Sequence, residues 1–145
     1  MSLWNDSTTG LVTLPDGRRI RGRGLREGLP ANDELPEFGL YLTARRHQEE
    51  TWESSWISWP DFRLPRSPGA AIAALTDAYE RSASSRVEIA CDGGTGRTGV
   101  AIALLARLAG VSGEDAVRWA RANYRQRAIE TPWQRRFVAR FDFEP

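Results

Sequence analysis

The segment from Cys91 to Gly99 constrains what this chain of 145 residues can form more than any other part of the sequence. It reads Cys-Asp-Gly-Gly-Thr-Gly-Arg-Thr-Gly and contains the only cysteine of the chain. Three glycines before the arginine allow backbone angles and close approaches that side chains forbid, so consecutive N–H groups can turn inward as a nest for an anion. The segment therefore predicts a loop that holds an anion beside a sulfur atom.

The residues after this loop predict a buried helix whose N-terminus faces the anion. The run from Thr98 to Ala109 is apolar on nearly every side, and Gly110 is a typical helix end. The partial positive charge of a helix N-terminus, the inward N–H groups and the guanidinium of Arg97 all favour the thiolate form of Cys91. Arg97 can also donate two parallel N–H groups to phosphoryl oxygens. This combination predicts phosphatase chemistry on a catalytic loop at residues 91–98.

The catalytic loop has a predicted role for each of its positions. Cys91 is the predicted nucleophile, and the hydroxyl of Thr98 is expected to hydrogen-bond the sulfur and ease its departure as a leaving group. The other loop residues are predicted to bind the phosphoryl group: Asp92, Gly93, Gly94, Thr95, Gly96 and Arg97. The carboxylate of Asp92 would oppose a bound dianion and is therefore expected to point outward.

A second loop supplies a candidate acid. Trp59-Pro60-Asp61-Phe62 follows a predicted strand at residues 54–58, and Pro60, which lacks an N–H group, ends regular strand pairing there. Asp61 then lies on a strand-end loop, residues 59–62, where its carboxyl group can protonate a leaving oxygen and later accept a proton from water. Pro-Asp is also ordinary turn chemistry, so this interpretation depends on Cys91 and Arg97 as well.

The pattern of the remaining chain predicts an α/β fold. Strands are expected at residues 11–14, 18–21, 38–43, 54–58 and 87–91, the first two of them as a hairpin. Pro68 begins a helix with apolar residues at helical spacing, and residues 112–115 predict a capping box before another helix. The alternation of strands and helices favours parallel pairing of the catalytic strand, covered on both faces. Glu88 on this strand has no explanation in the sequence.

Together, Cys91 to Arg97 and Trp59-Pro60-Asp61 resemble the cysteine-dependent protein tyrosine phosphatase superfamily, and the resemblance extends over residues 38–141. The chain is most similar to the compact, dual-specificity-like branch, which includes small bacterial members. Residues 93–97 and Ala128-Ile129-Glu130-Thr131 resemble the cyclin-dependent-kinase-inhibitor-associated phosphatases in particular. The resemblance implies a three-layer α/β/α fold in which helices flank a central, mainly parallel sheet.

The resemblance also implies a mechanism without a metal or another cofactor. A phosphocysteine intermediate forms on Cys91, Arg97 binds the phosphoryl group, Asp61 acts as general acid and base, and Thr98 assists hydrolysis. One position departs from the family pattern next to the cysteine, because Ala90 stands where a histidine is usual.

A second departure concerns the residue that positions water. Larger members of the family use a glutamine where this chain has Glu130, which leaves Gln134 as the candidate. Thr131-Pro132-Trp133-Gln134 is, however, also typical of a helix start with a capping box. Trp133, Phe137 and Phe141 would then share one apolar face. Trp133 is expected to pack in the core, with contact to an aryl substrate at the pocket rim as the alternative.

Three hypotheses on function follow from these residues. The first is a phosphatase that acts on phosphotyrosine-containing protein, with phosphoserine and phosphothreonine also accepted. The second is a phosphatase of phosphoinositides or other small phosphoesters, and the third is a phosphoprotein-binding module with weak or no turnover. In each case phosphate, sulfate or vanadate is expected to occupy the loop.

Composition argues against some other classes. All twenty basic residues are arginines, but the clusters at residues 18–26 and 118–140 come without an aromatic platform or a nucleic-acid motif, so no nucleic-acid partner is predicted. The longest uncharged apolar run, Val100 to Ala106, is too short to span a membrane. A reactive thiol with no disulfide partner persists best in a reducing compartment. A single domain over residues 1–145 in a bacterial cytoplasm is therefore expected.

Overall fold

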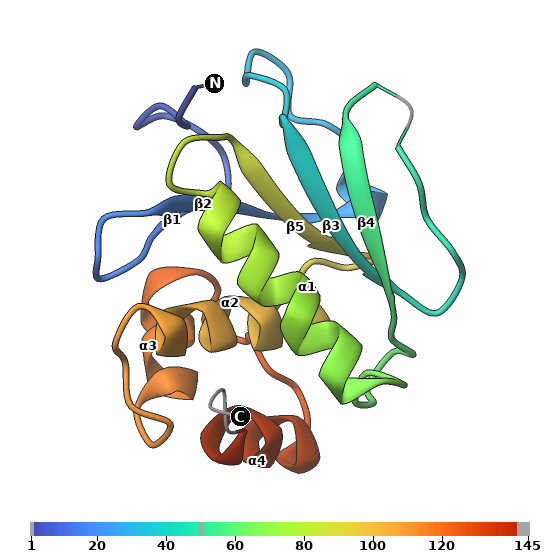
Figure 1. Ribbon diagram of the computed structural model, residues 1–145, viewed down its shortest axis with the longest axis vertical. Helices are drawn as coiled ribbons and strands as arrows, with labels where there is room; N and C mark the ends of the chain where they lie inside the picture. Colours follow the sequence, from blue (N-terminus) through green and yellow to red (C-terminus); the bar gives the residue numbers. More distant parts are fainter. Residues whose placement is uncertain (1, 50, 142–145) are drawn as a thin grey trace.

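The computed structural model describes residues 2–49 and 51–141, which form a five-stranded sheet with helices packed against it (Figure 1). The strands are β1 (Leu11–Thr13), β2 (Arg19–Gly24), β3 (Phe38–Thr43), β4 (Glu53–Ser58) and β5 (Val87–Cys91). Their order across the sheet is β1-β2-β5-β3-β4. β1 and β2 form an antiparallel hairpin, whereas β2, β5, β3 and β4 run parallel. The predicted strands are confirmed, and the strand that ends at Cys91 lies at the centre of the sheet.

The helices lie together on one side of this sheet (Figure 1). They are α1 (Pro68–Arg81), α2 (Gly96–Leu108), α3 (Ala116–Asn123) and α4 (Pro132–Arg140), with one 3₁₀ turn, η1 (Leu25–Glu27), after β2. α2 packs on β5 and β2, α1 packs on β3 and β4, and α3 and α4 pack against α2. None of the helices in the described ranges has the length and apolarity that crossing a membrane requires. The α/β fold with a central, mainly parallel sheet is confirmed.

The alternation of side chains along β5 separates the two faces of the sheet. The odd-numbered residues face the helices and belong to the hydrophobic core. The even-numbered residues, Glu88 and Ala90, point to the opposite face. Irregular segments that carry Trp4 and Trp52 cover this second face, because Trp4 lies under the guanidinium of Arg21 and Trp52 donates a hydrogen bond to Tyr41. The layer on this face is therefore built from loops.

Glu88, which the sequence leaves unexplained, is the centre of a buried cluster of charges. Its carboxylate accepts hydrogen bonds from Arg21 Nη2 at 2.8 Å, from Arg23 Nε at 2.7 Å and from the Tyr41 hydroxyl at 2.9 Å. Burial alone would raise the pKa of Glu88, but the hydrogen bonds and charges of Arg23 and Arg21 outweigh it and lower this pKa. Asp33 supplies a second negative charge to this cluster, because its Oδ2 lies 3.6 Å from Arg21 Nη1. Arg21 and Arg23, which belong to the basic cluster at residues 18–26, thus lie in the interior of the fold.

The helix starts follow the capping rules to different degrees. Ser67 Oγ accepts the N–H group of Ala70 at the start of α1, and Pro68 occupies the first helical position. Before α3, Ser112 Oγ accepts the N–H group of Asp115 at 3.2 Å, but the Asp115 carboxylate binds the Ser112 hydroxyl rather than its N–H group. The predicted capping box at residues 112–115 is therefore only half formed.

Candidate active site

The catalytic loop starts where β5 ends and leads into α2. Cys91 is the last residue of the central strand and is 2% exposed. The N–H group of Gly94 donates to Cys91 Sγ at 3.1 Å. Gly94 has φ +77°, and a Cβ at this position would collide with the backbone of Gly24, so only glycine fits. The N–H group beside the sulfur agrees with the anion nest predicted from the glycines.

Arg97 lies in the first turn of α2, and its side chain is 2% exposed. Its Nη1 donates to Trp59 O at 2.9 Å, which ties the catalytic loop to the acid loop. Its Nη2 lies 3.6 Å from Asp61 Oδ1 and 3.4 Å from Asp92 Oδ2. Its Nε is buried and has no hydrogen-bond partner among the described residues. A buried guanidinium N–H group without a partner fits an oxyanion that binds at this position.

The expectation that Asp92 points outward is wrong. Its carboxylate turns toward Arg97. The physical reason is charge balance, since a guanidinium that is removed from water needs a counter-charge nearby. Asp92 and Asp61 supply this charge together. A phosphoryl group that binds Arg97 therefore competes with both carboxylates.

Asp61 lies on the loop after β4, as the sequence predicts, and its side chain is about half exposed. Trp59 is fully buried, and its Nε1 donates to Arg63 O at 2.7 Å, which anchors the loop at both ends. Phe62 has φ +59°, which is unusual for a bulky residue, and its N–H group donates to Asp61 Oδ1 at 3.0 Å. The anchored loop brings the carboxyl group of Asp61 to the guanidinium of Arg97.

Glu130 is a third carboxylate at this site. The sequence predicted no role for it, and identified it only as the residue at the position where larger family members have a glutamine. Its Oε1 occupies the space that a Cβ at Gly96 would need, at the start of α2. Burial and the negative charge of Asp61 raise the pKa of Glu130, and the charge of Arg97 opposes them. Ile129 before it has φ +67°, which is rare for a β-branched residue. Only the fold brings this carboxylate to the catalytic loop.

Thr98 and Gln134 are both expected to assist catalysis, and the structure shows the hydrogen bonding of each side chain. Thr98 Oγ1 is buried and has no hydrogen-bond partner in the described part of the chain, so the expected bond to the sulfur is not formed. Gln134 is fully buried, and its Oε1 accepts the N–H groups of Glu130 at 3.1 Å and Thr131 at 3.2 Å. Its Nε2 donates to Arg63 O, and its own N–H group donates to Thr131 Oγ1. The predicted capping box of α4 is confirmed, and the positioning of water by Gln134 stays a prediction.

Trp133 lies at the rim of the site, and the expectation that it packs in the core is wrong. It is 48% exposed, and its Nε1 donates to Phe62 O at 2.6 Å. Phe137 and Phe141, by contrast, pack against the core and against each other, with 5.2 Å between their ring centroids. A cavity of about 740 Å³ is lined by Asp61, Phe62, Arg63, Leu64 and Trp133. The alternative position at the pocket rim is therefore the one that Trp133 adopts.

The arrangement suits phosphoryl transfer. Three groups meet at the end of β5: a sulfur atom that accepts a backbone N–H group, a buried guanidinium whose Nε has no partner among the described residues, and a carboxyl group 3.6 Å from that guanidinium. Among residues 2–49 and 51–141, no group of three or more His, Cys, Asp or Glu side chains has the arrangement of a metal site. Arg97 and the backbone of the loop can meet the charge of a phosphoryl group here.

Comparison with known proteins agrees with this geometry. The family model for the protein-tyrosine phosphatase matches residues 32–140. The chain belongs to the protein-tyrosine phosphatase family. This phosphatase is similar in structure to Tk-PTP in the active form, with a TM-score of 0.65 and 20% sequence identity over 90% of this chain and 93% of that chain. PTPMT1 matches with a TM-score of 0.48 and 13% identity over 70% of this chain and 73% of that chain.

Membership of the family gives the activity of the chain. It is a cysteine-dependent phosphatase of the tyrosine or dual-specificity type, as the sequence predicts. The family does not favour the two alternatives, a phosphoprotein-binding module with weak or no turnover and a phosphatase of phosphoinositides or other small phosphoesters.

Proposed function

We propose that the phosphatase works through a phosphocysteine intermediate on Cys91. The thiolate attacks the phosphorus atom and forms an S–P bond, while the P–O bond to the leaving group breaks and Asp61 donates a proton to the departing oxygen. Water then attacks the phosphorus atom, and Asp61 takes up one of its protons. The S–P bond breaks, which returns the thiolate and releases inorganic phosphate.

The proposal rests above all on the guanidinium of Arg97. Its Nε is buried and unpaired among the described residues, beside the loop of Cys91 and within ion-pair distance of Asp61. When a phosphoryl group binds Arg97, it takes the place of Asp61 at Nη2, and the carboxyl group becomes free to act on the leaving oxygen. The hydroxyl of Thr98, which is also buried and has no partner in residues 2–49 and 51–141, can bind the sulfur as it leaves.

Phosphate release from an aryl phosphate tests this mechanism. The wild-type protein should release phosphate and, after an acid quench, carry one phosphoryl group on Cys91 in mass spectrometry. Cys91→Ser should release none, and Asp61→Asn should be slower by about 10²–10⁴-fold. Asp77→Asn is the control, because Asp77 forms an exposed ion pair with Arg81 on α1 and should keep the wild-type rate. Turnover that survives Cys91→Ser would contradict the proposal.

We further propose that phosphotyrosine in protein is the preferred substrate. Phe62 and Trp133 flank Asp61 and are 51% and 48% exposed, and the cavity of about 740 Å³ beside them has room for an aryl ring. Aromatic rings pair in offset or edge-to-face contact. The ring of phosphotyrosine can make such contacts while its phosphate reaches the catalytic loop, whereas phosphoserine and phosphothreonine have no ring to contribute.

Three substrates measured side by side test this preference: a phosphotyrosine peptide, the same peptide with phosphothreonine, and an inositol phosphate. Trp133→Ala should lower kcat/KM for the phosphotyrosine peptide by about tenfold, the value of one aromatic contact, and change the phosphothreonine rate much less. Leu35→Ala is the matched control, because Leu35 is 47% exposed and does not line the cavity. A higher kcat/KM for inositol phosphate than for phosphotyrosine would overturn the preference.

Three further features belong to the same proposal. A reactive thiol supports a reducing compartment such as a bacterial cytoplasm. One hydrophobic core that joins the sheet to all four helices supports a single domain over residues 1–145. Phosphate, sulfate and vanadate are expected to occupy the catalytic loop and to inhibit competitively.

A further inference from the structure

The catalytic loop can direct N–H groups at a phosphoryl group only if its carbonyl oxygens point away, because a peptide unit carries the two at opposite ends. The outward oxygens then need donors of their own. Gly93 O accepts a hydrogen bond from Arg125 Nη1 at 3.0 Å, and Gly94 O accepts one from the Tyr124 hydroxyl at 2.5 Å. Both donors follow directly after α3. Two consecutive carbonyl groups of the loop are therefore bound by side chains from a distant part of the sequence.

One peptide unit is held at both of its ends. The C=O group of Gly93 and the N–H group of Gly94 belong to the same unit, which donates to Cys91 Sγ on one side and accepts from Arg125 on the other. If this unit turned over, its oxygen would point at the sulfur. Packing restrains this unit on one side, because it lies against the backbone of Gly24, but nothing lies within 4 Å of a Cβ placed at Gly93, and glycine adopts many backbone angles. The two hydrogen bonds therefore act together with this packing to set the direction of the unit.

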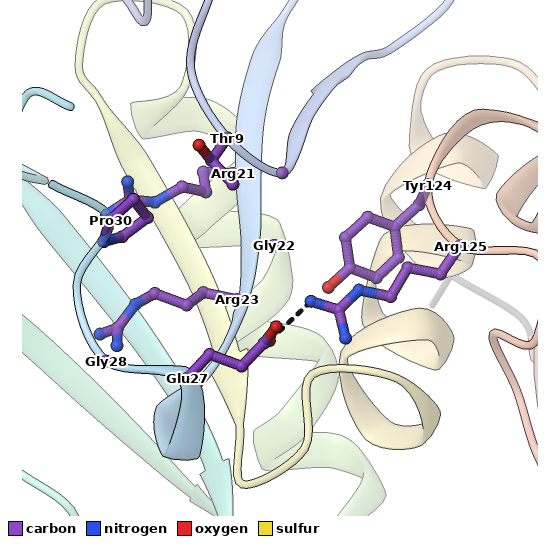
Figure 2. A pocket seen from close by; sticks show the side chains of 10 residues that line it. Thr9, Arg21, Gly22, Arg23, Glu27, Gly28, Pro30, Tyr124 and Arg125 are labelled. Carbon is purple, nitrogen blue, oxygen red and sulfur yellow. Dashed lines mark hydrogen bonds and ion pairs between the residues drawn. The ribbon is translucent and has the colours of Figure 1, made fainter. Parts of the chain in front are cut away.

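Arg125 is itself held in place by Glu27. Its Nη2 donates to Glu27 Oε1 at 2.7 Å, and Figure 2 shows this pair beside Tyr124 in a cavity of about 470 Å³. The same carboxylate oxygen accepts the N–H group of Gly24 at 3.0 Å. The hydrogen bond from Arg125 lowers the pKa of Glu27, and burial opposes it, so Glu27 is charged at neutral pH. Glu27 thus connects the end of β2 to the side chain that holds the loop.

We propose that Tyr124, Arg125 and Glu27 form a carbonyl clamp that positions the catalytic loop of this phosphatase. The clamp binds the outward carbonyl groups of the loop and so keeps the opposite N–H groups directed at the sulfur and the phosphoryl group. Ala90 offers no side-chain donor for this purpose. The inference rests on the proposed function of the loop, and the three residues act through the loop without touching the substrate.

Variants of the clamp test this role through kcat. Tyr124→Phe removes one hydroxyl and leaves the ring, which packs against Gly22. Arg125→Ala should lower kcat by about 10–100-fold, somewhat less than the loss of a direct oxyanion donor, and Tyr124→Phe by several-fold, with smaller changes in KM. Arg125→Lys should retain more of the rate than Arg125→Ala but less than the wild-type protein. Its single ammonium group cannot bridge Gly93 O and Glu27 as the guanidinium fork does.

Arg118→Ala is the matched control. Arg118 lies on α3 and forms an exposed ion pair with Asp115, so its loss should leave kcat unchanged. Thermal unfolding of each variant separates a loss of fold from a loss of position, since a merely structural role lowers the Tm without an effect on kcat in the folded protein. If Arg125→Ala fails to fold, Arg125→Lys and Tyr124→Phe decide the question.

Alkylation of Cys91 by iodoacetamide gives a readout that needs no turnover. The N–H group of Gly94 stabilises negative charge on the sulfur, so alkylation at pH 7 should be slower in Arg125→Ala and Tyr124→Phe than in the wild-type protein. A wild-type protein that releases no phosphate would count against the proposed function. A wild-type protein that is active, together with clamp variants that keep kcat and the alkylation rate within about twofold, would overturn the clamp alone.

Discussion

The substitution of Asp92 by asparagine should tighten the binding of phosphate, although Asp92 belongs to the catalytic loop. Asp92 Oδ2 lies 3.4 Å from Arg97 Nη2, so a phosphoryl group has to displace an ion pair before it can bind Arg97. A partly exposed pair contributes about 0.5–1 kcal/mol. A carboxylate about 7 Å from a dianion also repels it by about 1.2 kcal/mol in water, and salt reduces this to roughly half.

The sum of the two effects is about 1–1.5 kcal/mol, which corresponds to about 5–13-fold tighter binding. Asp61 lies 3.6 Å from Arg97 and remains as a counter-charge, so the variant should fold normally. The tighter binding therefore reports on the site alone.

Competitive inhibition by inorganic phosphate measures this effect directly. The inhibition constant should fall by about 5–13-fold in Asp92→Asn at physiological ionic strength, and the difference should shrink as more salt screens the charges. Asp77→Asn removes the same charge from an exposed pair with Arg81 and should leave the constant unchanged. A higher inhibition constant in Asp92→Asn would refute the reasoning, because the carboxylate would then assist rather than oppose the anion.

Two further predictions concern stability. Glu88→Gln leaves the buried guanidiniums of Arg21 and Arg23 without their shared counter-charge. It should lower the free energy of unfolding in urea by about 3–5 kcal/mol. An unchanged midpoint of urea unfolding would contradict this account. The wild-type protein should also lose stability as the pH falls through the lowered pKa of Glu88, because protonation removes the same charge. Glu130→Gln should raise the Tm at pH 7 and not at pH 4. The raised pKa of Glu130 means that the folded state disfavours the charged carboxylate, and this penalty grows as the pH rises through that pKa.

The elements of the fold could be predicted because their signals are local. β3 and β5 have the predicted bounds, since each is a short run with strand-forming residues between turn-forming ones. Pro68 likewise marks the start of α1, where its fixed φ suits the first helical position. The loops on the second face have no periodic pattern, so their position under the sheet could not be predicted. The same holds for the partners of Glu88, which come from two other strands.

The catalytic loop could be predicted from the spacing of Cys91 and Arg97, but the direction of side chains around it could not. The carboxylate of Asp92, whose side chain is 42% exposed, turns toward Arg97 because this guanidinium is buried and needs a counter-charge, and this depends on how closely Asp61 approaches from another loop. Trp133 is exposed because α4 starts beside the acid loop and its indole N–H group binds Phe62 O. Each direction is set by a contact between segments that the sequence does not place side by side.

The register between β2 and β5 connects the buried charges with the catalytic loop. Arg21 pairs with Glu88 in this register and Gly24 pairs with Cys91, so the position of one pair determines the position of the other. Glu88 binds Arg21 and Arg23 on one face of the sheet, and a shift of β2 by one residue would turn both arginines to the opposite face and break both contacts. The same shift would remove Gly24 from Gly94 and from the carboxylate of Glu27. The buried ion pairs of Glu88 with Arg21 and Arg23 are therefore expected to support the geometry at Cys91, because they fix the register of β2 against β5. In this role they select one strand register, which matters more than the net stability that they contribute.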